Sequence, residues 1–215
     1  MTQNAGYAGA DGQQIITMWE LYGCGMEQVA TAVAAELGLP LHGQAFSSDD
    51  VEAETEAREK EGTFGRWLRG LTPVASPVGG LKDDMARIGE DRSIEETART
   101  VRADVNAFAD EGGVILGRNG AFLLQGRPGA LHVKLVGKLE ERVARAAAIS
   151  GIDTEKATRR QPIEDDFRRD LAMKLFRFDP LEDDYYDLVL DTTRFSLEEC
   201  VSLIVQAAQM RKQSA

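Results

Sequence analysis

Short apolar runs alternate with longer stretches of mixed polarity along most of the chain. Runs of this kind, bounded by turn residues, are typical of buried strands, and they occupy residues 15–19, 39–46, 114–116, 131–136 and 188–191. The longer stretches carry apolar residues at helical spacing and predict helices at 26–37, 94–111, 138–150, 153–178 and 196–210. This alternation predicts the α/β class, with a parallel sheet between two helix layers in an α/β/α arrangement.

Local signals mark the ends of two of these helices. Gly38 follows the last apolar position of the first helix and suits a left-handed C-cap, and Pro40 prevents the helix from resuming. Ser196 is followed three residues later by Glu199, which is the spacing of a capping box. The first helix is therefore expected to end at Gly38, and the last one to begin after Ser196.

The same pattern divides the chain into one domain with attached segments. Residues 15–210 are expected to form a single domain. Residues 1–14 are small and polar and predict a disordered tail, and 211–215 predict a C-terminal tail. Residues 47–94 begin with a very acidic helical stretch and continue into a loop rich in proline and glycine, which indicates an inserted lobe. Residues 153–178 are rich in arginine and acids and are interpreted as a lid-like helical region.

Composition narrows the classes of function. The net charge of −11 disfavours a nucleic-acid partner, since phosphate backbones attract basic surfaces. No apolar stretch approaches the roughly 20 residues that span a bilayer, so no membrane partner is expected. The two cysteines lack the spacing of metal ligands and the two histidines are too few, so no protein metal site is expected. Two cysteines also make no disulfide framework, so a reducing, cytoplasmic setting is the default expectation. A homodimer is compatible with the sequence but does not follow from it.

Candidate chemistry follows three of the predicted strands, at 20–25, 117–119 and 191–194. In a parallel α/β sheet, ligands bind at the carboxyl ends of the strands. Backbone N–H groups of a glycine turn at a helix N-terminus bind anions, and arginines add bidentate bonds to phosphate oxygens. The turn with Gly23 and Gly25 therefore indicates a phosphate site, although two glycines also suit a tight strand–helix turn without function.

Four segments in sequence order resemble the cytidylate kinase-like family, a branch of the P-loop nucleoside monophosphate kinases. Residues 15–40 resemble its first strand, glycine turn and first helix, in a branch that usually lacks the Walker lysine. Residues 114–146 resemble the block with a Gly-Arg-Asp turn, 163–169 resemble its Asp-x-x-Arg motif, and 185–204 resemble its last strand and helix. The resemblance implies a P-loop kinase-like fold in which the insert 47–94 binds the acceptor.

The resemblance also implies an activity and a set of site residues. It implies transfer of a phosphoryl group from a nucleoside triphosphate, such as ATP with Mg²⁺, to a nucleoside monophosphate or a similar small phosphorylated acceptor. The donor's phosphates would lie at the glycine turn, formed by Tyr22, Gly23, Cys24, Gly25, Met26 and Glu27. By the same resemblance, Arg118 contacts the acceptor phosphate, Arg168 faces phosphate and Asp165 supports the acceptor nucleoside, while Arg159 and Arg160 are lid arginines.

The chain departs from the family at the donor site. Met26 and Glu27 stand where a P-loop has lysine and a hydroxyl residue, and where this branch usually has glycine and arginine. Glu20 lies before the turn where the branch has arginine, and Asn119 replaces the aspartate of Gly-Arg-Asp. A carboxylate that faces a phosphate is repulsive, so Glu20 and Glu27 either point away or, for Glu27, help to hold Mg²⁺.

Three functions remain open from the sequence. The first is an active phosphotransferase, the second a catalytically impaired pseudokinase that binds nucleotide as a sensor or interaction protein, and the third a scaffold. Several site residues also have structural interpretations. Arg118 can be a satisfied structural arginine, Asp165 and Arg168 have the spacing of a helix-surface ion pair, and Glu27 suits the first turn of any helix. Cys24 lies at a helix N-terminus, where a thiol pKa is commonly lowered.

Overall fold

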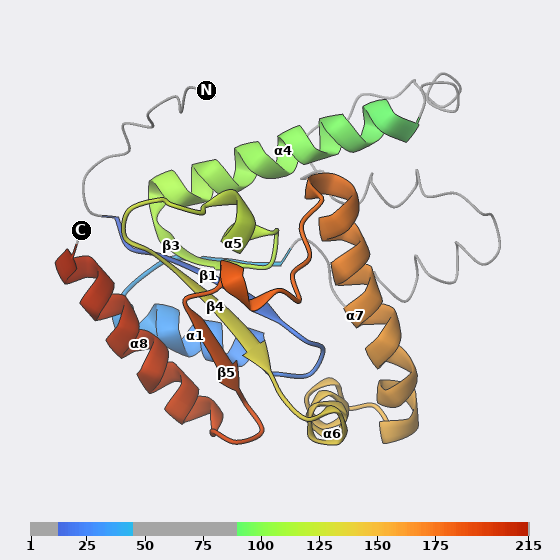
Figure 1. The fold of residues 1–215 in the computed structure, drawn as a ribbon. Coiled ribbons are helices and arrows are strands. Elements are labelled where there is room, and N and C mark those ends of the chain that lie inside the picture. Colours follow the sequence, from blue (N-terminus) through green and yellow to red (C-terminus); the bar gives the residue numbers. More distant parts are fainter. Residues whose placement is uncertain (1–12, 45–89, 215) are drawn as a thin grey trace, which may run out of the picture.

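The computed structural model describes residues 13–44 and 90–214. Residues 1–12 of the tail expected at 1–14 lie outside the described residues, as do residues 47–89 of the inserted lobe and residue 215. The strands of the described part form one parallel sheet in the order β2-β3-β1-β4-β5 (Figure 1). They are β1 (Ile15–Glu20), β2 (Leu41–His42), β3 (Gly113–Leu116), β4 (Ala130–Val136) and β5 (Leu188–Asp191).

Strand β1 lies at the centre of this sheet. It pairs with β3 on one side, with Ile15 opposite Gly113, and with β4 on the other, with Ile15 opposite Ala130. All six residues of β1 are buried. Continuous burial is expected for a parallel strand that is covered on both faces, so the loop after β1 leaves the sheet at the middle of its carboxyl edge.

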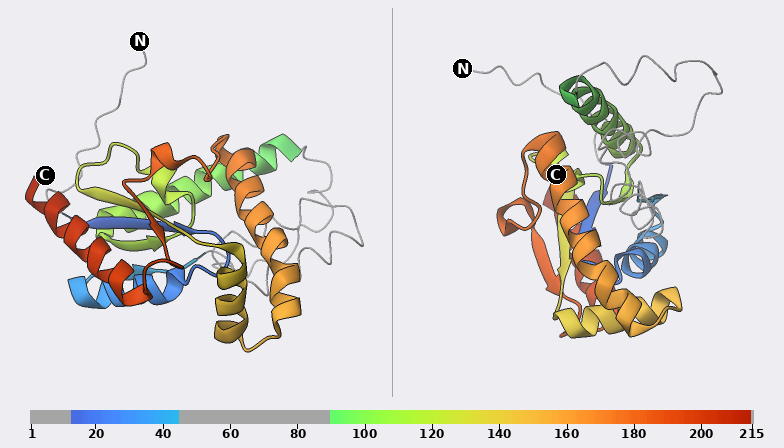
Figure 2. Two further views of the ribbon diagram at one scale, coloured as in Figure 1. Left: turned by 60° about the horizontal axis from the view of Figure 1, so that its bottom comes forward. Right: turned by 90° about the vertical axis from the view of Figure 1, so that its right-hand side faces the viewer.

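Helices cover both faces of the sheet, as the sequence predicts. They are α1 (Met26–Leu37), α4 (Glu90–Glu111), α5 (Gly120–Leu123), α6 (Leu139–Ser150), α7 (Thr154–Phe176) and α8 (Leu197–Ser214). One core cluster joins α1 and α8 to the sheet, and another joins α4 and α7 to its opposite face. Figures 1 and 2 show α1 and α8 on the side of the sheet away from α4. The three-layer α/β/α prediction is confirmed.

Helices α6 and α7 form the part of the fold that approaches the glycine turn. They pack against each other through a small cluster that includes Val143, Ala147 and Ala157. Helix α7 begins with a cap in which Asp153 Oδ1 accepts a hydrogen bond from Lys156 N at 2.6 Å. Figure 1 shows α6 beyond the end of β4, and α7 running from the vicinity of α6 back toward α4. The arginine-rich region expected to be lid-like is thus the single long helix α7.

Most predicted boundaries are confirmed, and three are corrected. Helix α1 ends at the left-handed Gly38, whose N–H bonds to carbonyls of the last turn. The Ser196 capping box forms in both directions, at 2.8 and 3.2 Å. Helix α8 continues to Ser214, so 211–214 are not a tail. Helix α4 starts at Glu90, inside the range given to the inserted lobe. Gln14 belongs to the fold, since its carbonyl accepts a bond from Gly113 N at 2.9 Å.

Two short elements were not predicted, namely α5 and a 3₁₀ turn at Asp183–Tyr185. Elements of three or four residues are too short to show a hydrophobic period. None of the helices in residues 13–44 and 90–214 is long and apolar enough to cross a membrane.

Candidate functional site

The glycine turn connects the end of β1 to the start of α1. Gly23 and Gly25 have φ of +81° and +85°, in the left-handed region that favours glycine. A Cβ atom at residue 23 would lie 2.2 Å from the carbonyl oxygen of Arg142 in α6. Glycine at position 23 is therefore required both by the backbone conformation and by the close approach of α6.

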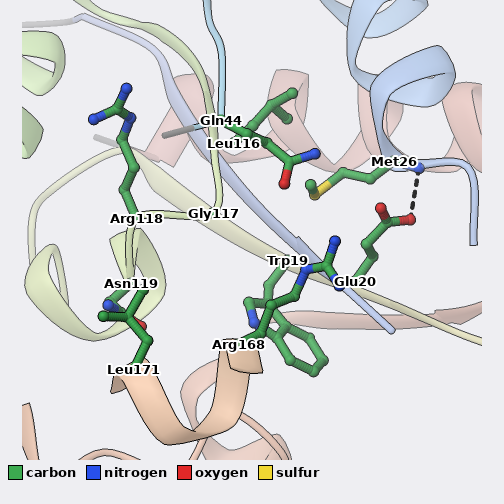
Figure 3. A pocket seen from close by; sticks show the side chains of 10 residues that line it. All are labelled: Trp19, Glu20, Met26, Gln44, Leu116, Gly117, Arg118, Asn119, Arg168 and Leu171. Atoms are coloured by element: carbon green, nitrogen blue, oxygen red, sulfur yellow. Dashed lines mark hydrogen bonds between the residues drawn. The ribbon is translucent and has the colours of Figure 1, made fainter. Parts of the chain in front are cut away.

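Two N–H groups of this turn bind carboxylates of the chain itself. Met26 N donates to Glu20 Oε2 at 2.9 Å, and Tyr22 N donates to Asp165 Oδ1 at 2.7 Å. Figure 3 shows the first of these bonds at the N-terminus of α1. The turn thus has the anion-binding property expected of a helix N-terminus. In this structure both amides are occupied, one by the carboxylate of Glu20 and the other by that of Asp165.

The outer side of the turn is held by two arginines of α6. Arg142 Nη1 donates to the carbonyl of Tyr22 at 2.8 Å and lies 3.3 Å from Asp165 Oδ2. Arg145 Nη1 donates to the carbonyls of Gly23 and Cys24, each at 3.3 Å. These bonds engage carbonyls of the turn, while the amides of Tyr22 and Met26 bond to carboxylates. Neither arginine was predicted as a site residue, although two arginines spaced by three on the helix after β4 are a signal in the sequence.

A small, partly open pocket lies beside the turn, at the carboxyl ends of β1 and β3. It is lined by Trp19, Glu20, Met26, Gln44, Leu116, Gly117, Arg118, Asn119, Arg168 and Leu171 (Figure 3). This is the edge of the sheet where an α/β fold binds ligands. Among the residues expected from the sequence, Arg118, Arg168 and Met26 line this pocket together.

Arg168 reaches the pocket from α7 with part of its hydrogen-bonding capacity unused. Its Nη2 donates to Glu164 Oε2 at 2.8 Å, and the two side chains are only 10% and 2% exposed. Arg168 Nη1 and Glu164 Oε1 find no hydrogen-bond partner among the described residues. Because buried polar atoms are ordinarily paired, these two atoms leave one donor and one acceptor whose hydrogen-bonding capacity is unused at the pocket. Arg168 pairs with Glu164 and Asp165 with Arg142, so the surface ion pair considered from the sequence is wrong.

Arg118 lies across the pocket, in a strained turn after β3. Arg118 and Asn119 have φ of +51° and +57°, a conformation that is unfavourable for residues other than glycine and that clusters at functional sites. Arg118 Nε donates to the carbonyl of Gly43 at 3.1 Å, and its guanidinium lies over the ring of Phe108 and 3.9 Å from Asp104. The side chain is therefore oriented by its neighbours, in part as a structural arginine would be.

Three other residues expected at the site point elsewhere. Arg159 is exposed and pairs with Glu155 at 2.7 Å, and neither Arg159 nor the buried Arg160 lines the pocket. Glu27 is exposed in the first turn of α1. Within the described residues, no three His, Cys, Asp or Glu side chains are grouped as a metal site requires. Of the two carboxylates beside the turn, that of Glu27 points away from the pocket into solvent, and that of Glu20 points into the pocket.

Burial dominates the electrostatics of Glu20. Removal from water raises the pKa of its carboxyl group, and the charge of Arg168 together with the bond from Met26 N opposes this rise. The carboxylates of Glu164 and Asp165 raise it further. Since the folded-state pKa exceeds the unfolded value of 4.5, Glu20 contributes stability below that pH and loses it as pH rises through the folded pKa.

This electrostatic environment predicts a pH-dependent effect of Glu20→Gln. Glutamine cannot ionise, so the melting temperature of the variant should exceed that of the wild type at pH 8. The excess should shrink as pH falls, because the raised pKa lets folded Glu20 take up a proton at a higher pH than the unfolded chain does. In a chain of this size about 1 kcal/mol corresponds to about 2–4 °C. Thermal melts at pH 8 and at lower pH test this, with the exposed Glu27→Gln as control. An excess that is independent of pH would contradict the assigned environment.

Cys24 is buried, and its pKa is raised rather than lowered. Burial, followed by the charge of Glu20, raises the pKa of the thiol to about 12. The N-terminal position in α1 therefore does not activate it, contrary to the expectation from sequence. Cys200 is also buried, and its pKa is raised for the same main reason.

The two thiols should consequently be inert in the folded protein. At pH 8 they are protonated and shielded, so iodoacetamide is expected to label neither cysteine until a denaturant is added. Mass spectrometry of the labelled protein measures this directly. Rapid labelling of Cys24 without denaturant would contradict the closed packing of the glycine turn.

The fold and pocket together define a class of protein. A parallel sheet whose central strand runs through a glycine turn into a helix N-terminus is the P-loop arrangement, and the fold is P-loop kinase-like. The model of the cytidylate kinase-like family matches residues 15–194, and the chain belongs to this family. The resemblance found in the sequence is confirmed.

Individual relatives cover the chain in part. The chain is 36% identical over 108 residues to a cytidylate kinase of Methanopyrus kandleri, over 46% of this chain and 56% of that protein. It is 33% identical over 147 residues to a protein of Corynebacterium glutamicum named uronate isomerase, over 68% of this chain and 27% of that protein. The chain therefore spans about half the length of the first relative and about a quarter of the second.

A solved structure supports the fold independently. An uncharacterised protein of Eubacterium ventriosum superposes with a TM-score of 0.64 at 18% identity, over 92% of this chain and 99% of that chain. At this identity the likeness concerns the fold alone.

Proposed function

We propose that the chain is a cytidylate kinase-like phosphotransferase. It moves a phosphoryl group from a nucleoside triphosphate, such as ATP with Mg²⁺, to a nucleoside monophosphate or a similar small acceptor. One observation carries the proposal. Arg118 and Arg168 line the same pocket beside the glycine turn, and Arg168 Nη1 has no hydrogen-bond partner in the described part of the chain.

The pocket's charges suit an acceptor phosphate. Guanidinium groups bind phosphate oxygens through paired, charge-assisted hydrogen bonds. An acceptor phosphate is already ionised near neutral pH, so its attack on the donor's terminal phosphorus needs no general base. Its oxygen forms the new bond as the bond to the bridging oxygen of the donor breaks. Such transfer depends mainly on positioning and on neutralising charge, which Arg118 and Arg168 would supply on the acceptor side.

A second candidate function is nucleotide binding without turnover. The observation that favours it is the carboxylate of Glu20 at the N-terminus of α1, 2.9 Å from Met26 N. A terminal phosphate of the donor does not fit there while Glu20 remains. Met26 also takes the place of the Walker lysine, which normally neutralises donor charge. In this case the protein would act as a sensor for the acceptor nucleotide.

A coupled assay separates the two candidates. The full chain is incubated with ATP, Mg²⁺ and one of the four common nucleoside monophosphates, and nucleoside diphosphate is measured. Turnover with one monophosphate preferred over the others is the expected result. Saturable monophosphate binding with no product would favour the second candidate. A cooperatively folded protein that neither turns over nor binds any monophosphate would overturn both.

A further inference from the structure

Glu20 occupies the position at the glycine turn where a phosphate would bind. We propose that Glu20 determines which phosphate ligands the pocket accepts. With Glu20 in place, the pocket takes a monophosphate at Arg118 and Arg168, and a di- or triphosphate binds well only after Glu20 leaves the turn. The binding of a monophosphate in this pocket rests on the proposed function. The competition between Glu20 and a phosphate at the turn rests only on the observed contact of Glu20 with Met26 N.

The contact of Glu20 is the one that a phosphate oxygen would make. Its Oε2 accepts a hydrogen bond from Met26 N, the first residue of a helix of 12 residues. Gly25 caps that helix in a left-handed conformation and offers no side-chain cap. A carboxylate oxygen and a phosphate oxygen are equivalent acceptors for such an N–H group, and both are stabilised by the helix dipole. The two anions therefore compete for the same donor.

A second, independent feature points to an anionic ligand in the same pocket. The side chain of Arg168 is 10% exposed, lines the pocket, and has an Nη1 group without a partner in residues 13–44 and 90–214. Figure 3 shows its guanidinium near Glu20. In this proposal a single phosphate group binds at Arg118 and Arg168 while Glu20 keeps its bond to Met26 N. A longer phosphate chain that extends to the N-terminus of α1 cannot.

The charges around Glu20 add to this discrimination. Arg168 is the cation that favours its ionised form, while the carboxylates of Glu164 and Asp165 on α7 oppose it. Cys24 lies in the field of Glu20 and contributes no charge, because its pKa is about 12. A second anion placed against an ionised Glu20 in this buried setting meets strong repulsion. Loss of the Glu20 charge would remove this repulsion, while Arg168 would keep its bond to Glu164.

Calorimetric titrations of the full chain test this assignment with three probes, which are CMP, ATP and inorganic pyrophosphate. The variants are Glu20→Ala, which vacates the position, and Glu20→Gln, which keeps a neutral acceptor for Met26 N. The matched control is Glu27→Gln, which removes the same charge from the exposed side of the same helix turn. Thermal melts establish that each variant is folded.

The expected changes are specific to the length of the phosphate chain. Glu20→Ala should bind ATP and pyrophosphate at least about tenfold more tightly than the wild type, since the Met26 N–H that Glu20 occupies is freed for a phosphate oxygen. Glu20→Gln should gain less, because its amide oxygen still occupies Met26 N. Affinity for CMP should change by no more than about threefold, and Glu27→Gln should change each affinity by about twofold or less.

The outcomes distinguish this inference from the proposed function. If CMP binds but folded Glu20→Ala gains no more affinity for ATP and pyrophosphate than Glu27→Gln, the role of Glu20 is refuted and the acceptor pocket stands. If Glu20→Ala gains pyrophosphate affinity while CMP fails to bind any variant, the acceptor function fails and competition at the turn stands. If no probe binds to any folded variant, both are overturned.

Discussion

Replacement of Gly23 by alanine is expected to destabilise the protein by about 3–4 kcal/mol, a large effect for one methyl group. A left-handed backbone conformation costs an alanine about 1–2 kcal/mol. The new Cβ would also lie 2.2 Å from the carbonyl oxygen of Arg142, a backbone atom that cannot rotate away. Relief of this clash requires α6 to move from the turn, which would break the bonds from Arg142 and Arg145.

Gly38→Ala is the matched control for this prediction. Gly38 also has a positive φ, of +66°, but a Cβ there would meet no atom within 4 Å. Its substitution by alanine should lower the free energy of unfolding by about 1 kcal/mol, the cost of the left-handed backbone conformation alone. Urea unfolding of the three proteins measures both costs. Equal losses for Gly23→Ala and Gly38→Ala would show that α6 does not lie against the turn.

Arg168→Gln is expected to lower the affinity for CMP by about ten- to a hundredfold. Hydrogen bonds to charged groups contribute about 1.5–3 kcal/mol, and each 1.4 kcal/mol is a tenfold change. The substitution also leaves Glu164 buried without its partner, so the single variant loses stability as well as affinity. The double variant Glu164→Gln/Arg168→Gln removes both charges and separates the two effects.

Arg159→Gln controls for the loss of an arginine from the same helix. Arg159 is exposed, pairs with Glu155 and lies outside the pocket. Its replacement should change the CMP affinity by about twofold or less. Calorimetry on the wild type and the three variants gives the affinities, and thermal melts give the stabilities. Equal losses of affinity for Arg159→Gln and the double variant would contradict the position given to the acceptor phosphate.

Local sequence signals were sufficient to predict the strands, the glycine turn and the helix ends around the site. Apolar runs located the strands, and the glycines at 23 and 25 located the turn between β1 and α1 because glycine tolerates left-handed conformations. The Ser196 capping box and the Gly38 cap depend on residues within four positions of each other. The general rule for parallel sheets then placed Arg118 and Met26 at one edge, where the pocket is found.

The partners of the charged residues were not predictable in the same way. Asp165 binds the amide of Tyr22 across 143 positions of sequence, and Arg142 binds the carbonyl of Tyr22 across 120. No local pattern specifies such contacts. The inward orientation of Glu20 and the outward orientation of Glu27 likewise depend on where α1 and α7 pack. The left-handed turn at Arg118 and Asn119 was also missed, because neither residue signals it as glycine does.

We propose above that the pocket between Arg118 and Arg168 binds a nucleoside monophosphate. Titration of CMP into the wild-type chain by calorimetry at pH 7 tests it most directly, since it requires neither the donor nor movement of Glu20. The predicted result is saturable binding at one site in the micromolar range. Absence of binding by CMP and by the other common monophosphates, in a protein that melts cooperatively, would contradict it.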